Sequence, residues 1–421
     1  MHKTEKEFPK IGEKYVRADL DNGLTCFIIP KSVSTSYAAL AVDFGSRDTH
    51  TSDGDVFMTG LAHFLEHKMF ETKEGDALAK YASYGGNGNA YTASDMTVYN
   101  FSCAEHFYEN LSILLDHVMN AHYTKRSVDK EKGIISQEIM MYADNPNRRC
   151  HLLLLESLYG ECSISADPCG TVTDIQTVTP QMLNACRSKA YALSNMALCV
   201  WGDVDADKVL QIVTQSLPER PNGKKICFQS FGRSETILRR VYSETGDVAS
   251  PLFNIGIRLD LDGVFMDVKT FAAIEIIMNV LFGKSSKLYS ELYEAGLFEM
   301  LSDNCQTNRE SSYALIGGIS RDPEALYGKI CEKLEEFASS GIDERDFERT
   351  KKAIYADLLF SFENSNTADL AISFFFDGDD LFEYPSVIAS VDKPFAESLL
   401  KKLFVPKNTC LIYIKPKEET P

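Results

Sequence analysis

Two histidines and a glutamate stand close together in the first half of the chain, in the order His63-x-x-Glu66-His67. Neutral imidazoles are common ligands of zinc, and a carboxylate beside them can take a proton from a water molecule that the metal holds. The order is the inverse of the H-E-x-x-H pattern found in many zinc peptidases. The residue types and their spacing therefore indicate hydrolysis at a metal centre.

A helix over residues 60–71 would position these three side chains. Apolar residues recur there with the spacing of one helical face, at Leu61, Phe64, Leu65 and Met69. On such a helix His63 and His67 lie one turn apart and share a face. Glu66 lies ~60° to the side of His63, at ~100° per residue, so it flanks the pair without being a ligand. The alternative is a helix with two surface histidines, because so short a pattern also arises by chance.

A catalytic zinc ion usually has three protein ligands, so a third has to come from elsewhere. All 8 histidines lie at or before His151, and a ligand from the second half would therefore be a carboxylate or a cysteine. The strongest candidate segment is a second expected helix over residues 128–142, which carries Glu131 and Glu138. A buried stripe is expected on this helix at Ile134, Ile135, Ile139 and Met141.

Glu131 and Glu138 are seven residues apart on this expected helix. They project from nearly the same face, but ~10.5 Å apart along the axis. Only one of them is therefore expected to bind the ion, while the other orients the site or contacts substrate. The spacing leaves open which residue has which role. Two glutamates on a helix are also typical of a solvated face.

The sequence resembles the insulinase/pitrilysin family of zinc metallopeptidases, most closely its bacterial YmfH-like subgroup. The metal motif followed by Glu131-x6-Glu138 carries this resemblance, which extends over nearly the whole chain. Other segments similar to the family are Asn22–Leu24, Phe44–Asp48, Asn89–Tyr99 and Val200–Asp205.

The resemblance implies a role for each residue of the motifs. It assigns His63, His67 and Glu138 as ligands of one zinc ion per chain, Glu66 as the general base and Glu131 as an accessory glutamate of the site. It also implies an α+β fold of two homologous domains, similar to mitochondrial processing peptidase. Each domain would be an antiparallel sheet with helices packed on one face.

The length of the chain independently favours two domains, because 421 residues exceed a single hydrophobic core. Two prolines, a glycine and several charges predict a linker at 218–235, between an N-terminal domain at 1–217 and a C-terminal domain at 236–421. The halves read as a divergent repeat. An expected strand at 37–44 precedes the metal motif, and a similar strand at 253–259 precedes an apolar helix.

A glycine-rich turn at 84–88 leads into an expected strand that contains Asn89, Ala90, Tyr91 and Thr92. In the resembled family this strand is a sheet edge near the zinc. An extended peptide substrate could pair with it through backbone hydrogen bonds. The four residues are therefore expected to bind substrate. The alternative is a hairpin turn with no role in binding.

The second domain departs from the family pattern. Active members have an Arg and a Tyr there, seven residues apart, that contact the substrate. In the matching stretch, 285–299, Tyr293 stands at the Arg position and Glu299 at or near the Tyr position. A glutamate would repel a developing oxyanion. Arg309 and Tyr313 lie downstream, but no motif makes them substitutes.

This departure suggests the zinc subunit of a heterodimer, in which a zinc-free homologue brings the Arg and Tyr. A homodimer is the alternative. A non-catalytic scaffold subunit is the competing function, but such relatives typically lose the zinc ligands that this chain keeps. A metal sensor or store is a third function, and it would not need Glu66.

Composition excludes several other classes. The net charge of −18 disfavours a nucleic-acid partner, because phosphate binding needs clustered lysines and arginines. No apolar run approaches the ~20 residues that span a bilayer, and the N-terminus lacks the apolar core of a signal peptide. We therefore expect a cytoplasmic bacterial protein. Its 11 cysteines, including Cys162 and Cys169 beside a loop, are expected to be free thiols.

Overall fold

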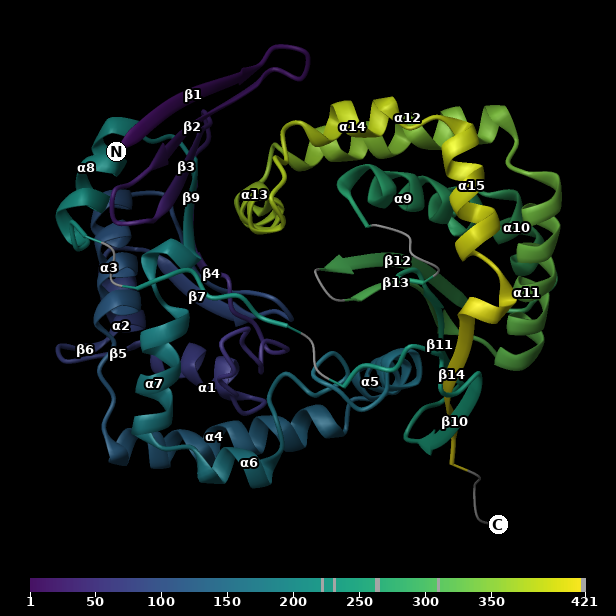
Figure 1. Cartoon of the computed structure of the whole chain (residues 1–421), viewed down its shortest axis with the longest axis horizontal. Coiled ribbons are helices and arrows are strands. Elements are labelled where there is room, and N and C mark those ends of the chain that lie inside the picture. The colour runs from purple at the N-terminus through teal and green to yellow at the C-terminus, as the bar shows by residue number, and fades with distance from the viewer. Residues whose placement is uncertain (221–222, 230–231, 262–265, 309–310, 418–421) are drawn as a thin grey trace. The chain divides into compact units, whose positions relative to one another are not determined.

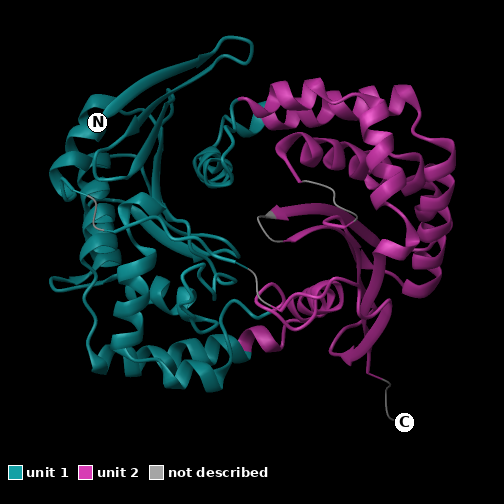
Figure 2. Ribbon diagram, in the orientation of Figure 1, with its two compact units in different colours: residues 1–140, 166–230, 359–382 teal, residues 141–165, 231–358, 383–421 magenta. Residues whose placement is uncertain are grey.

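The computed structural model describes residues 1–220, 223–229, 232–261, 266–308 and 311–417, and it divides into two compact units (Figure 2). Unit 1 comprises Met1–Met140, Ala166–Ser230 and Leu359–Phe382. Unit 2 comprises Met141–Ser165, Phe231–Leu358 and Glu383–Pro421. Each unit contains one large β-sheet.

Unit 1 is built on a seven-stranded sheet in the order β1-β2-β3-β9-β4-β8-β7, so that β7 is an edge strand (Figure 1). Its strands are β1 (His2–Phe8), β2 (Glu13–Asp19), β3 (Thr25–Pro30), β4 (Ser36–Val42), β7 (Asn87–Thr92), β8 (Thr97–Cys103) and β9 (Met196–Gly202). A small separate ribbon pairs β5 (Glu71–Thr72) with β6 (Gly75–Asp76).

The helical elements of unit 1 are α1 (Leu61–Lys68), α2 (Ala77–Ser83), α3 (Phe107–Asn120), α4 (Lys125–Ala143), α6 (Val172–Thr177), α7 (Pro180–Ala190), η1 (Leu193–Asn195), α8 (Ala206–Ser216) and α13 (Asn366–Asp377). The side chains of β4 alternate between two faces, as a strand requires. Leu40 and Val42 join the main core with α1 and α3, while Tyr37 faces α13 on the opposite side.

Unit 2 is built on a five-stranded sheet in the order β10-β14-β11-β13-β12. Its strands are β10 (Val241–Gly246), β11 (Leu252–Arg258), β12 (Met300–Asn308), β13 (Ser311–Ile319) and β14 (Thr409–Pro416). Its helical elements are α5 (Pro146–Tyr159), α9 (Val268–Phe282), α10 (Lys287–Glu294), α11 (Pro323–Ser340), α12 (Glu344–Ser361, whose end lies in unit 1), α14 (Tyr384–Ser390), α15 (Lys393–Leu403) and η2 (Pro406–Asn408).

The two sheets repeat one pairing scheme. In unit 1, β3 runs parallel to β9, and β9, β4, β8 and β7 then follow with antiparallel neighbours. In unit 2, β10 runs parallel to β14, and β14, β11, β13 and β12 follow in the same way. The predicted α+β fold of two related halves is therefore confirmed. The structure adds one parallel pair to each sheet.

Each sheet also carries a helix on its second face, contributed by the other half of the sequence. The helix α13 packs on β4 and β9, and α5 packs on β11 and β14. Gly256 of β11 leaves room for this contact, because a Cβ there would lie 2.7 Å from Leu154 of α5. The domain boundaries predicted from sequence, at 1–217 and 236–421, remain a proposal. The spatial units differ from them by exchanging 141–165 and 359–382, and the linker expected at 218–235 includes residues outside the described ranges.

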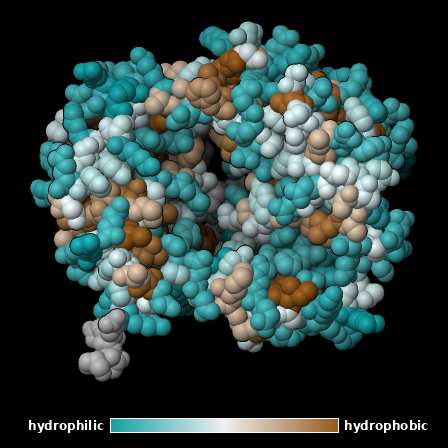
Figure 3. Space-filling view, turned by 180° about the vertical axis from the view of Figure 1, so that it is seen from behind, coloured by the Kyte–Doolittle hydropathy of each residue, from teal (hydrophilic) through white to brown (hydrophobic). Residues whose placement is uncertain are grey.

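Hydrophilic side chains predominate on the face drawn in Figure 3, with apolar residues in small groups among them. Among the described residues, no helix has the length and apolar character that crossing a membrane requires. The 11 cysteines all lie among the described residues, and none of them is joined to another by a disulfide there. Most are buried, and burial raises the pKa of thiols such as Cys26 and Cys186.

The buried ring of His117 on α3 supports the end of the helix α1. Its Nδ1 lies 3.3 Å from the carbonyl oxygen of Met69, and its Nε2 lies 3.1 Å from the hydroxyl of Tyr81. The ring also stacks on Phe70 at 5.0 Å between centroids. Burial lowers the pKa of His117 to about 4, so the ring is neutral at pH 7.

This lowered pKa predicts that unit 1 loses stability in mild acid. The unfolded chain binds a proton at His117 below its ordinary pKa, whereas the folded chain does not do so until about pH 4. Stability therefore falls as the pH falls through this window, by about 2 kcal/mol between pH 7 and pH 5. Denaturant unfolding of metal-free protein, followed by the fluorescence of the single Trp201, measures it. In His117→Gln this part of the pH dependence should vanish, and an unchanged dependence would contradict the assignment.

Candidate metal centre

The helix α1 holds both histidines of the motif. It begins after Gly60, whose φ of 84° lies in the left-handed region that favours glycine. The predicted apolar stripe is confirmed, because its members are all buried: Leu61, Phe64, Leu65 and Met69. The rings of His63 and His67 lie 4.6 Å apart between centroids, as expected for neighbours one turn apart.

Glu138 on the helix α4 lies beside both rings. Its Oε1 is 3.6 Å from Nε2 of His63, and its Oε2 is 3.5 Å from Nε2 of His67. In a tetrahedral zinc site with bonds of about 2.1 Å, neighbouring donor atoms lie roughly 3.4 Å apart. The donor types are those that zinc prefers, and each nitrogen lies near that distance from its own oxygen of the Glu138 carboxylate. Nδ1 of His63 is buried, with no hydrogen-bond partner among the described residues.

Glu131, about two turns before Glu138 on α4, contacts the other ring nitrogen of His67. Its Oε1 lies 3.0 Å from Nδ1 of His67, and its Oε2 accepts a hydrogen bond of 3.3 Å from Nζ of Lys68. Nδ1 of His67 is thus engaged, and Nε2 is left for a metal. The two glutamates therefore differ in geometry: Glu138 meets the Nε2 atoms, and Glu131 fixes the orientation of one ring.

Lys68 is a residue of this centre that the sequence reasoning missed. Its side chain is fully buried and pairs with both Glu71 and Glu131. A buried ammonium is costly unless it is paired, so Lys68 holds Glu131 in place. The types of the charged residues in the sequence do not reveal that Lys68 is buried. The position of Lys68 directly after His67 was the one usable signal.

The charges of the centre shift two pKa values in opposite directions. Burial raises the pKa of Glu131, but the hydrogen bond with His67 and the charge of Lys68 outweigh it and hold that pKa below its usual value. Burial lowers the pKa of His67, but the hydrogen bond to Glu131 and the nearby carboxylates outweigh it and raise that pKa. The two shifts agree, because each partner favours the charged form of the other.

Glu66 lies beside the histidines, and not between them. Its carboxylate and one nitrogen of each ring lie within 4.8 Å of one another. The hydroxyl of Thr92 donates a hydrogen bond of 3.2 Å to its Oε2. Burial raises the pKa of Glu66, although the two histidines and Thr92 act against this shift. A carboxyl whose pKa is raised toward neutrality suits a group that takes and returns a proton.

The edge strand β7 presents its residues to two different sides. Ala90 packs against the main core, and Thr92 reaches Glu66 from the same face. Asn89 is exposed, and the hydroxyl of Tyr91 instead donates to Asp369 of α13 at 3.1 Å. Of the four residues predicted to bind substrate, Thr92 is the one whose side chain hydrogen-bonds to a residue of the motif.

The predicted buried stripe of α4 is partly wrong. Ile135 is fully buried and Ile139 partly so, but Ile134 is 46% exposed and Met141 is 61% exposed. The helix meets the core through a narrower stripe, formed with Val128, seven residues before Ile135. The neighbouring face is occupied by the glutamates that approach α1.

Cys169 also belongs to the surroundings of the centre. Ligand atoms of His63, Glu138 and Cys169 lie within 4.8 Å of one another, and the cysteine is 3% exposed. The sequence reasoning treated it as an ordinary free thiol. The spacing of Cys162 and Cys169 fits no known redox or metal template, so the sequence gave no signal that Cys169 lies near the motif.

In unit 2 the residues at the expected Arg and Tyr positions have other surroundings. Tyr293 is 61% exposed on α10, and Glu299 accepts a hydrogen bond of 3.0 Å from Nε of Arg321. Tyr313 is buried and donates a hydrogen bond of 2.6 Å to Gln306. Arg309 lies outside the described residues.

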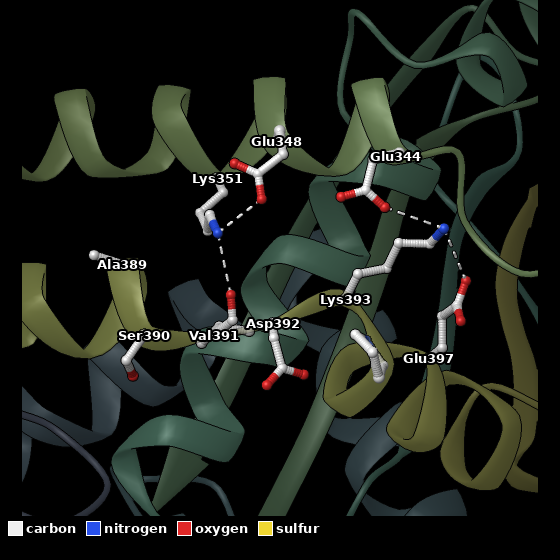
Figure 4. A pocket seen from close by; sticks show the side chains of 10 residues that line it. Glu344, Glu348, Lys351, Ala389, Ser390, Val391, Asp392, Lys393 and Glu397 are labelled. Carbon is white, nitrogen blue, oxygen red and sulfur yellow. Dashed lines mark hydrogen bonds and ion pairs between the residues drawn. The ribbon is translucent and has the colours of Figure 1, made fainter.

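A charged pocket of about 390 Å³ lies on unit 2, between α12 and the segment that joins α14 to α15 (Figure 4). Its two lysines are already paired. Lys351 contacts Glu348 at 2.9 Å, and Lys393 contacts Glu344 at 3.4 Å. The pocket contains no histidine, so its lining lacks the imidazole donors of the motif in unit 1.

Comparison with known proteins agrees with the chemistry of the centre. The family model of Insulinase (Peptidase family M16) matches residues 27–166, and that of the Peptidase M16 inactive domain matches residues 177–354. YmfH of Bacillus subtilis, named an uncharacterized zinc protease, is 31% identical over 347 residues, which cover 78% of this chain and 79% of YmfH.

Solved structures show the same fold. A structure from Alicyclobacillus acidocaldarius, described as an M16-like peptidase, is 30% identical and superposes with a TM-score of 0.91, covering 98% of this chain and 100% of that one. Pitrilysin, at 19% identity, has a TM-score of 0.77 and covers 98% of this chain and 46% of its own. The chain therefore belongs to the insulinase family of peptidases, peptidase family M16.

Proposed function

We propose that this chain is a zinc-dependent endopeptidase that hydrolyses peptide bonds in peptides or in a small precursor. His63, His67 and Glu138 would hold one zinc ion, with Glu66 as the general base. One observation carries the proposal: the carboxylate of Glu138 contacts Nε2 of both histidines, one oxygen to each at 3.6 and 3.5 Å, with Glu66 beside the rings. The names of relatives such as YmfH, a zinc protease, support the same chemistry.

A bound zinc ion would supply an activated water molecule, by lowering the pKa of that water to ~7. The chain's own residues would then manage the proton. Glu66 accepts it at its carboxylate and later passes it to the leaving amine. Its hydrogen bond from Thr92 leaves Oε1 available for this transfer. Glu131 and Lys68 keep His67 in the tautomer and orientation that present Nε2.

The edge strand β7 is the proposed docking place for the peptide. Its outer backbone groups are not paired within the sheet, because β8 is its single neighbour there. An extended peptide could add to this edge and bring one carbonyl to the metal, with Asn89, Ala90, Tyr91 and Thr92 along it. Methylation of the peptide's backbone nitrogens removes these hydrogen bonds and should weaken binding. Equal binding of methylated and unmethylated peptides would exclude the arrangement.

A scaffold role is less well supported, because it would not require the paired glutamates or a buried base. Acidic charge and the absence of a membrane-spanning helix among the described residues agree with a peptide-binding protein, and the bacterial cytoplasm is our proposal for its location.

The first prediction separates metal binding from catalysis. Glu66→Gln should still bind one zinc ion per chain, because Glu66 is not among the three proposed ligands. Its rate of peptide cleavage should fall by about 10²–10⁴-fold, the usual contribution of a general base. Metal analysis and a quenched-fluorescence peptide assay measure the two effects. Glu74→Gln, at an exposed glutamate paired with Lys80, is the matched control. Cleavage by Glu66→Gln at the wild-type rate would remove Glu66 from its role.

The second prediction concerns the orientation of His67. Glu131→Gln should lower zinc affinity by about 10–100-fold, because the ring loses the partner that fixes it. Lys68 keeps its ion pair with Glu71, so the fold should hold. Competition with a chelator measures the affinity. Asp129→Asn, at an exposed position of the same helix, should bind zinc as the wild type does. Undiminished affinity in Glu131→Gln would contradict the orienting role.

The third prediction concerns a partner. We propose a two-chain enzyme, in which a zinc-free homologue supplies the Arg and Tyr that this chain replaces with Tyr293 and Glu299; a homodimer is the alternative. Adding the homologue from the same genome should raise the cleavage rate, and changing its Arg to Ala should cancel the gain. A rate that stays constant on addition of the homologue would count against the two-chain enzyme, without affecting the zinc site.

A further inference from the structure

Cys169 lies beside the proposed zinc ligands without being part of the family's ligand set. Its sulfur, a nitrogen of His63 and an oxygen of Glu138 all lie within 4.8 Å of one another. The same carboxylate of Glu138 also approaches His67. Cys169 is therefore a further potential donor beside two of the three proposed ligands, His63 and Glu138. Among protein donors, a cysteine sulfur is one that zinc accepts readily, at about 2.3 Å.

The backbone holds this cysteine in place. Its N–H donates to Oδ1 of Asp167 at 2.8 Å, and the N–H of Gly170 donates to the carbonyl of Asp167 at the same distance. These bonds close a tight turn around Cys169. The thiol is therefore carried by a short, internally bonded turn.

Two glycines, Gly60 and Gly170, allow that turn to pack closely against the start of the helix α1. A Cβ on Gly60 would lie 2.5 Å from the carbonyl oxygen of Cys169, and a Cβ on Gly170 would lie 2.8 Å from that of Thr59. Both glycines have φ values in the left-handed region, at 84° and 74°. Glycine alone allows this approach of the two backbones. Because His63 follows Gly60 by three residues, the contact sets the position of the thiol relative to the first imidazole.

A zinc ion held by His63, His67 and Glu138 keeps one position for water. We propose that Cys169 is a fourth protein donor, whose thiolate takes this position in a resting form of the enzyme; this inference rests on the proposed function. In that step the thiol would release its proton to solvent, and its sulfur would bond to zinc in place of the water. In the reverse step the sulfur–zinc bond would break, the sulfur would take a proton from solvent, and water would return to the metal. The chain thereby carries its own reversible inhibitor.

Cobalt-loaded full-length protein tests the sulfur–metal bond directly. A cobalt–thiolate bond gives a charge-transfer absorption in the near ultraviolet that nitrogen and oxygen ligands do not give. The wild type should show this band, and Cys169→Ser and Cys169→Ala should lose it while binding the same amount of cobalt. Cys162→Ser, at a half-buried cysteine seven residues earlier, should keep it.

A second readout needs no variant, so it holds even if the substitutions impair folding. Alkylation of Cys169 by iodoacetamide, followed by peptide mass spectrometry, should be slower with zinc or cobalt bound than in metal-free protein. Cys227, which is exposed, serves as the internal reference. Cys169→Ala should also cleave peptides faster than the wild type, because it has no thiolate to compete with water for the metal.

The outcomes distinguish this inference from the function on which it rests. One metal ion per chain with peptide cleavage, but without the charge-transfer band and with metal-independent alkylation, overturns the role of Cys169 alone. A wild-type chain that binds no zinc or cobalt overturns both. A band that disappears in Cys169→Ser and persists in Cys162→Ser supports the resting form.

Discussion

The structure depends on the contact between the helices α1 and α4 that places two carboxylates on two imidazoles. Glu138 meets Nε2 of both histidines, and Glu131 engages Nδ1 of His67. Seven residues separate the glutamates, so both project toward α1 while standing ~10.5 Å apart along the axis. One helix thus supplies both a direct donor and the group that orients another donor.

Charge balance keeps this contact in place. The helix α4 brings two carboxylates to the site, and the buried Lys68 of α1 offsets one of them. Removing Lys68 would take this compensating charge away, a loss that typically costs ~3–5 kcal/mol in a buried pair, whereas removing Glu131 leaves Lys68 paired with Glu71. The helix α1 is held by its buried apolar stripe and, at its end, by the ring of His117. Both contacts limit how far the two histidines can move apart.

The sequence predicted the metal motif and its helix well, because both depend on local periodicity. The apolar residues between Leu61 and Met69 recur on one face of a helix, and that face is buried in the structure. The α+β fold came from family resemblance. What pattern alone could not predict depends on contacts between distant segments: the exposure of Ile134 and Met141, the burial of Lys68, and the approach of Cys169. The exchange of α5 and α13 between the sheets was also not predicted, because the sequence of a helix does not indicate which sheet it packs on.

Zinc-edge anomalous diffraction from crystals of the zinc-loaded chain tests the account most directly. The account predicts one strong peak per chain, about 2 Å from Nε2 of His63, Nε2 of His67 and a carboxylate oxygen of Glu138. A peak bound by other residues, or zinc-loaded crystals in which these three side chains point apart, would contradict it.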